Sequence, residues 1–139
     1  MEPEDHKRIA HLFYERVIGK ADFSQASQVV GEDFLDHGNP HGLPRGVEGL
    51  KQFLAMLTTA FPDISIEVNE MIAEKDLVAV RLTISGTQKG VLLGTIPASG
   101  KRAAWNGMDF LRFAGGKIVE RWSVRDLLGL MRQIDAIKN

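Results

Sequence analysis

Residues 105–126 read WNGMDFLRFAGGKIVERWSVRD, and this segment gives the clearest indication of the fold. Two strand-like runs flank Ala114-Gly115-Gly116, and a glycine pair between apolar runs predicts a β-hairpin. Because alternate residues of a strand share a face, Asp109 lies on the same face as Trp105 and Gly107. On the second arm, the same alternation sets Ile118, Glu120, Trp122 and Val124 against Val119, Arg121 and Ser123. An unpaired carboxylate is costly inside an apolar strand, so Asp109 is the first candidate for a functional residue.

The composition indicates an ordinary globular protein of one domain, residues 1–139. Hydrophobic residues make up 44% of the chain and charged residues 25%, which is enough for a real core. A net charge of −1 without a basic run argues against electrostatic binding of nucleic acid. Cysteine is absent, which excludes disulfides and thiolate chemistry and fits a reducing cytoplasm. No signal core and no long apolar run occurs, so neither secretion nor a membrane-spanning segment is expected.

Outside the hairpin the chain predicts helices first and strands afterwards. Apolar stripes at helical spacing cover residues 4–18 and Val47–Phe61, and a shorter helix is expected over Gln25–Val30. Strands are expected at residues 33–37, 64–69, 77–85 and 91–93, with a turn-rich loop over residues 38–46. Asp126 is expected to cap a last helix whose inner side carries Leu127, Leu128, Leu130, Met131 and Ile134. This order predicts an α+β fold, a curved antiparallel sheet with helices packed on one face.

Several motifs in this order resemble one known family. They are Asp33-Phe34-Leu35-Asp36-His37, Gly46-Val47-Glu48-Gly49 before a helix ending Phe61-Pro62-Asp63, Ser85-Gly86-Thr87, and residues 115–122 followed by Asp126-Leu127-Leu128-Gly129-Leu130. Together they resemble the SnoaL-like polyketide cyclase family of the nuclear-transport-factor-2-like superfamily, over nearly the whole chain. The resemblance implies a cone-shaped α+β fold around an apolar pocket, no cofactor, and homodimers that pair through their sheets.

The resemblance also carries residue roles. The family's cyclases close a ring in polyketide esters by an aldol reaction, with an aspartate near the end of the last strand as proton-transfer group. This chain has Ser123 at that position, and serine cannot act as a carboxylate base. Asp109 matches a polar residue on the first arm of the hairpin, Asp36 a polar residue on the early strand, and Gln88 a histidine after the Gly-Thr pair.

Asp109 is the main candidate for acid/base catalysis. In a pocket lined by aromatic and aliphatic side chains, desolvation raises the pKa of a carboxyl group towards neutrality, which suits a general acid or base. The alternative is that Asp109 forms an ion pair with Arg112, Arg121 or another cross-strand partner.

Asp36 and His37 are candidates for a helper in proton transfer. As neighbours at a strand end they point in opposite directions, so only one of them enters the pocket. The alternative for His37 is a turn histidine that bonds the loop backbone. Tyr14 can donate a hydrogen bond to an enolate oxygen, although its neighbour Phe13 belongs to the core and favours a surface position for Tyr14. The other expected ligand-binding residues are Trp105, Trp122, Ser123, Gln88 and Phe53.

No metal site is expected. His37 and His41 are four residues apart, but a glycine- and proline-rich loop between them does not bring that spacing together. No HExxH pattern and no glycine-rich phosphate loop occurs.

Three functions remain open at this stage. The first is a cofactor-free cyclase or isomerase that acts on a small carbonyl-containing molecule through Asp109. The second is a small-molecule binding protein without catalysis, which the serine at position 123 favours. The third, implied by the resemblance because some members of the superfamily perform it, is epoxide hydrolysis by two aspartates and an arginine, here Asp109, Arg112 and Asp126. It is the weakest, because residues three apart in a strand face opposite sides.

Overall fold

The computed structural model describes residues 2–39 and 42–138. Its helices are α1 (Pro3–Leu12), the π-helix η1 (Phe13–Ile18), α2 (Ala26–Val29), α3 (Gly46–Ala60) and α4 (Leu127–Gln133). Its strands are β1 (Val30–Asp36), β2 (Ser65–Glu74), β3 (Leu77–Thr87), β4 (Arg102–Ala114) and β5 (Lys117–Arg125). Pro40 and His41 of the predicted loop lie outside the described residues.

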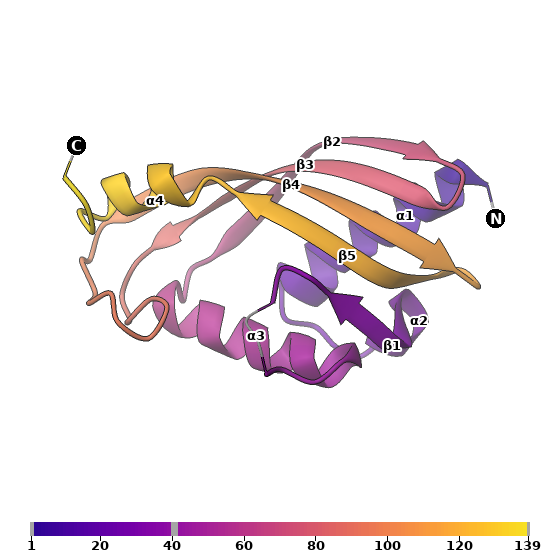
Figure 1. Ribbon diagram of the computed structural model, residues 1–139, viewed down its shortest axis with the longest axis horizontal. Helices are drawn as coiled ribbons and strands as arrows, with labels where there is room; N and C mark the ends of the chain where they lie inside the picture. Colours follow the sequence, from indigo (N-terminus) through magenta and orange to yellow (C-terminus); the bar gives the residue numbers. More distant parts are fainter. Residues whose placement is uncertain (1, 40–41, 139) are drawn as a thin grey trace.

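The strands form one curved sheet in the order β1-β5-β4-β3-β2. β2 to β5 pair as the expected antiparallel meander, whereas β1 pairs with β5 in parallel. Helices α1 and α3 lie on one face of the sheet, and α4 follows β5 and lies beside the start of β4 (Figure 1). The predicted α+β class, with helices on one face of a curved sheet, is confirmed.

The β4–β5 hairpin follows the predicted pattern on its first arm only. Gly115 and Gly116 have φ values of 57° and 78°, the left-handed conformation that a tight hairpin turn requires. β4 alternates strictly between buried and exposed side chains. β5 carries a bulge, because Phe113 pairs with Ile118 while Arg112 already pairs with Glu120. Ile118 therefore shares the buried face with the alternate residues 121, 123 and 125, and its predicted grouping with Trp122 is wrong.

The first helix, α1, continues at its C-terminal end as the π-helix η1. The amide of Gly19 donates to the carbonyl of Tyr14, five residues earlier, and the wider π-helical turn brings both Phe13 and Tyr14 into the core. Both side chains are fully buried. The surface position expected for Tyr14 is wrong, because the π-helical turn turns two neighbouring side chains to the core.

Two further expectations are wrong at the end of the molecule that carries α4. Residues 91–93 form no strand, and this segment makes a single bridge between Leu92 and Ile96. Asp126 caps α4 as predicted, through a 2.9 Å bond from the amide of Gly129, but Leu127 and Leu128, both expected on the inner side of this helix, are half exposed. No helix of the described residues is both long and apolar enough to cross a membrane.

Candidate functional site

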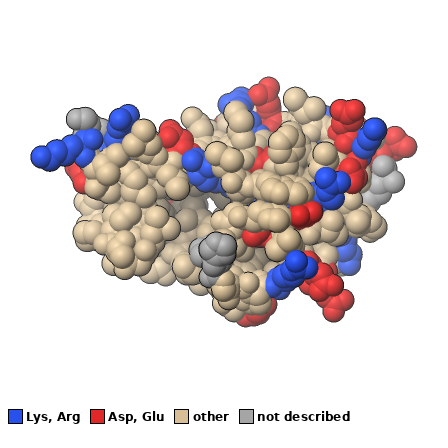
Figure 2. Space-filling model, in the orientation of Figure 1, with Lys and Arg blue, Asp and Glu red and all other residues tan. Residues whose placement is uncertain are grey.

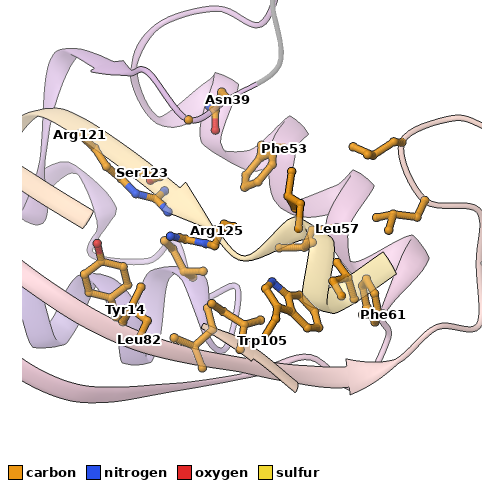
Figure 3. A pocket seen from close by; sticks show the side chains of 18 of the residues that line it. Tyr14, Asn39, Phe53, Leu57, Phe61, Leu82, Trp105, Arg121, Ser123 and Arg125 are labelled. Carbon is orange, nitrogen blue, oxygen red and sulfur yellow. The ribbon is translucent and has the colours of Figure 1, made fainter. Parts of the chain in front are cut away.

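A cavity of about 290 Å³ lies between the inner face of the sheet and the helices that cover it. Its floor is formed by β3, β4 and β5, and its walls by η1, α3, α4 and the segment after β3. Polar groups gather at one end and aromatic and aliphatic groups at the other (Figure 3). The polar lining residues are Tyr14, Asn39, Arg121, Ser123 and Arg125, and the apolar ones include Phe53, Leu57, Phe61, Leu82 and Trp105.

Asp109 is the centre of a charged cluster behind the polar end. Its carboxylate accepts hydrogen bonds from the hydroxyl of Tyr14 (2.5 Å), from Nε of Arg121 (3.1 Å) and from Nη1 of Arg125 (2.5 Å). Nη1 of Arg121 also donates to Asp36 at 3.0 Å. Asp109 pairs across the sheet with Ser123, so the two arginines flank Ser123 on the inner face of β5.

The cations and the carboxylates of this cluster differ in their access to the cavity. The side chains of Asp109 and Asp36 are 0% and 2% exposed, and neither lines the cavity. Arg121 and Arg125 both line it, and the Arg125 side chain is 21% exposed. The described residues supply partners for Nε and Nη1 of Arg121 but none for its Nη2. A ligand in the cavity can therefore contact the guanidinium groups of Arg121 and Arg125 but not the carboxylates of Asp109 and Asp36.

These contacts set the protonation of Asp109. Burial by itself raises the pKa of Asp109, but the charge of Arg121, the hydrogen bond and charge of Arg125 and the hydrogen bond from Tyr14 outweigh it. The pKa of Asp109 therefore lies below its ordinary value, and the predicted rise is wrong. The ion pair with Arg121, the alternative expected from sequence, is present.

Tyr14 and Arg121 keep their protons in the same cluster. Burial, followed by the charge of Asp109 and its hydrogen bond, raises the pKa of Tyr14 well above 10 despite the opposing charge of Arg121. Burial lowers the pKa of Arg121, but the charges of Asp109 and Asp36 outweigh it and raise that pKa further above its ordinary value. Tyr14 is thus a neutral hydrogen-bond donor, and Arg121 a permanent cation.

His37 lies outside the cavity, although Asp36 points towards it. The His37 ring stacks on Trp122 at 5.1 Å, and its Nε2 lies 2.6 Å from Glu120. These side chains occupy the outer face of the sheet, so neither His37 nor Trp122 lines the cavity. The ligand contact expected of Trp122 is wrong, and His37 is the member of the Asp36–His37 pair that does not enter the cavity, which contradicts a catalytic role for His37. The one-residue alternation at the end of β1 explains why Asp36 turns inward and His37 outward.

Gln88 holds the loop after β3 rather than facing a ligand. Its fully buried side chain donates to the carbonyls of Gly90 and Pro97 and accepts from the amide of Ser99. Gln88 does not line the cavity, so its predicted ligand contact is wrong.

Ser123, Phe53 and Trp105 do line the cavity. The Oγ of Ser123 and the Oδ1 of Asn39 are buried and have no hydrogen-bond partner among the described residues.

Sequence reasoning missed Arg125 and Asn39, and treated Arg121 only as a pairing partner. The available signal was the alternation of Arg121, Ser123 and Arg125 on one face of the strand. The bulge before residue 120 makes that face the inward one, which alternation from Ile118 does not predict. The set expected for epoxide hydrolysis is dispersed: Arg112 pairs with Asp76 at 3.0 Å on the outer face, and Asp126 caps α4. Within the described part of the chain, no group of three acidic, histidine or cysteine side chains is placed to hold a metal ion.

The fold and this site define a class of protein: a curved sheet of the nuclear-transport-factor-2-like type that encloses one cavity with a cationic end. The model of the SnoaL-like polyketide cyclase family matches residues 8–134. The chain belongs to the SnoaL-like polyketide cyclase family.

Solved structures agree with this assignment. TsrD from Streptomyces laurentii is similar with a TM-score of 0.87 and 26% identity, over 99% of both chains. Two further structures carry the name "putative polyketide cyclase". The one from Bacillus cereus has 29% identity and a TM-score of 0.80 over 96% of this chain and 83% of its own. IdmH from Streptomyces antibioticus has 26% identity and a TM-score of 0.77 over 97% and 99%. A search of curated proteins finds no match.

Proposed function

We propose that this chain is a cofactor-free cyclase or isomerase that acts on a small, mostly apolar carbonyl compound. One observation carries the proposal: Arg121 and Arg125 line the cavity, while the carboxylates that pair with them lie behind. Donors fixed in a water-poor site stabilise negative charge that develops on an oxygen, and the enolate of a carbonyl compound is such a charge.

The reaction proceeds through that enolate. The carbonyl oxygen of the substrate accepts hydrogen bonds from the two guanidinium groups, and the apolar part packs against Phe53 and Trp105. A C–H bond next to the carbonyl breaks, its proton passes to water at the cavity mouth, and its electron pair moves to the oxygen. For ring closure, the enolate carbon forms a C–C bond to a second carbonyl, whose oxygen takes a proton from water. For isomerisation, the proton returns at another carbon.

Asp109 and Asp36 act in this proposal as positioning residues. A carboxylate with a lowered pKa and three donors is a weak base, so Asp109 orients Arg121, Arg125 and Tyr14 instead of removing the substrate proton. Asp36 fixes the second branch of Arg121. His37, on the outer face, takes no part.

The second candidate is a binding protein of the same fold. It is favoured by the absence of any carboxylate or imidazole among the described residues that line the cavity. Such a protein binds the same carbonyl compounds but does not exchange their protons.

Hydrogen–deuterium exchange separates the two candidates. We expect the wild-type protein to accelerate α-proton exchange of ethyl 2-oxocyclohexanecarboxylate in deuterated buffer, measured by proton NMR. Arg125→Gln is expected to slow it roughly a hundredfold, as for removal of one donor to an oxyanion. Arg112→Gln, which alters an arginine on the outer face, is the matched control and retains the wild-type rate. Binding of the ester without exchange supports the binding protein and contradicts the enzyme.

A further inference from the structure

The mouth of the cavity is rimmed by exposed leucines. Leu93 and Leu127 both line the cavity, yet they are 61% and 50% exposed. The neighbouring residues Val91 and Leu128 are also about half exposed. Figure 2 shows charged side chains around the end of the molecule with the N-terminus and along the upper edge of the α4 end, whereas the lower left part of the α4 end is uncharged. Exposed apolar side chains gathered around a cavity mouth are typical of a ligand-binding or interaction site.

Leu93 is also held in a strained backbone conformation. Its φ of 53° lies in the left-handed region, which bulky residues rarely occupy, and Gly94 follows with a φ of 73°. Glycine would adopt this conformation at position 93 without the clash of a side chain. A leucine kept at a conformational cost, exposed to water, and bordering a cavity indicates a functional reason for its side chain.

The cavity itself is small. Its volume of about 290 Å³ lies at the lower end of the range for ligand pockets. A cavity of this volume suits a compact ring with its oxygens, and a longer apolar group would extend through the mouth. The leucine rim continues from the cavity wall, so such a group passes over Leu93 and Leu127.

We propose that Leu93 and Leu127 form a second subsite that binds an apolar extension of the ligand. The ligand class is then a compact oxygenated ring at the arginine end that carries an apolar chain or further ring across the rim. The inference rests on the proposed function only for the oxygenated end; the rim argument holds for an enzyme and for a binding protein alike.

A pair of esters tests the subsite. The ethyl and hexyl esters of 2-oxocyclohexanecarboxylic acid differ by four methylenes, and a fully buried methylene contributes up to about fourfold in affinity. On a half-exposed rim we expect about twofold for each methylene, so the hexyl ester binds at least tenfold more tightly. Binding is followed by tryptophan fluorescence, since Trp105 lines the cavity.

Leu93→Gly is the decisive variant. It removes the rim side chain and relieves the left-handed backbone, so the thermal midpoint is expected to stay or rise while the preference for the hexyl ester falls to about threefold or less. Affinity for the ethyl ester falls by a smaller factor than affinity for the hexyl ester. Lys75→Gly is the matched control, because Lys75 has a φ of 55° in the β2–β3 turn, outside the cavity. It keeps the full hexyl preference.

Three outcomes overturn the inference: equal affinity of the wild type for both esters, an equal loss of both in Leu93→Gly, or self-association of the protein that Leu93→Gly abolishes. Tight binding of the hexyl ester without exchange of its α-proton contradicts the proposed enzymatic activity but supports the rim subsite. Exchange of the ethyl ester without a hexyl preference refutes the rim subsite alone.

Discussion

The two faces of the β4–β5 hairpin reverse the usual distribution of side chains. The inner face buries Asp109 and Arg121, with Arg125 beside them, whereas on the outer face Met108 and Phe110 are 64% and 54% exposed. Buried ion pairs are no more stabilising than apolar residues of similar size, and exposed apolar patches give a monomer no benefit. Neither face is therefore arranged for folding alone. The inner face suits a ligand oxygen, and the outer face suits another protein surface.

The largest effect is expected from breaking the inner cluster. Asp109→Asn leaves two guanidinium groups without their shared carboxylate, so we expect the free energy of unfolding to fall by about 3–5 kcal/mol. The matched control is Asp76→Asn, which removes a pair with Arg112 in which both side chains are more than 40% exposed. There we expect a change of about 0–1 kcal/mol. Urea unfolding measures both, and equal losses would show that the inner cluster is not specially coupled.

A smaller effect is expected when the free energy of unfolding is measured at acidic pH. The folded pKa of Asp109 lies below its unfolded value of about 3.9, so its contribution to stability is present above about pH 4 and is lost as the pH falls through the folded pKa. The stability difference between wild type and Asp109→Asn should therefore shrink below pH 4. This difference, measured by urea unfolding at several pH values, isolates Asp109 from Asp22 and Asp63, whose pKa values are also lowered. A difference that stays constant down to pH 2 would contradict the lowered pKa.

The smallest effect on the monomer is expected on the outer face, where we propose that two copies pair through their sheets. Met108→Glu places a charge opposite Arg81 on an exposed strand position, so the free energy of unfolding of the monomer changes by no more than about 0.5 kcal/mol. Burying that charge between two sheets is unfavourable, and the variant is expected to be a monomer by sedimentation. Gln52→Glu, exposed on α3, is the control that leaves the assembly unchanged. A monomeric wild type would refute this pairing.

Much of the fold could be predicted because its signals are local. The glycine pair at the hairpin turn, the alternation along β4 and the helical stripe over α3 each depend on neighbouring residues. The misses are non-local. Three features were not predicted: the bulge in β5, the π-helical turn at Tyr14 and the exposure of Leu127. Each depends on what packs against the segment, and the spacing of residues in the sequence does not show those contacts.

Alternation along β4 already places Asp109 on one face with Trp105 and Gly107, whatever surrounds the strand. The role of Asp109 on that face depends on residues that are distant in the chain. Tyr14, which donates to it, lies 95 residues away in the chain, and Arg125 reaches it only because the bulge in β5 sets the inward face of that strand. Protonation depends on the sum of burial and nearby charge, and both are properties of the assembled site. For that reason the carboxylate expected to be a base became the anchor of two arginines.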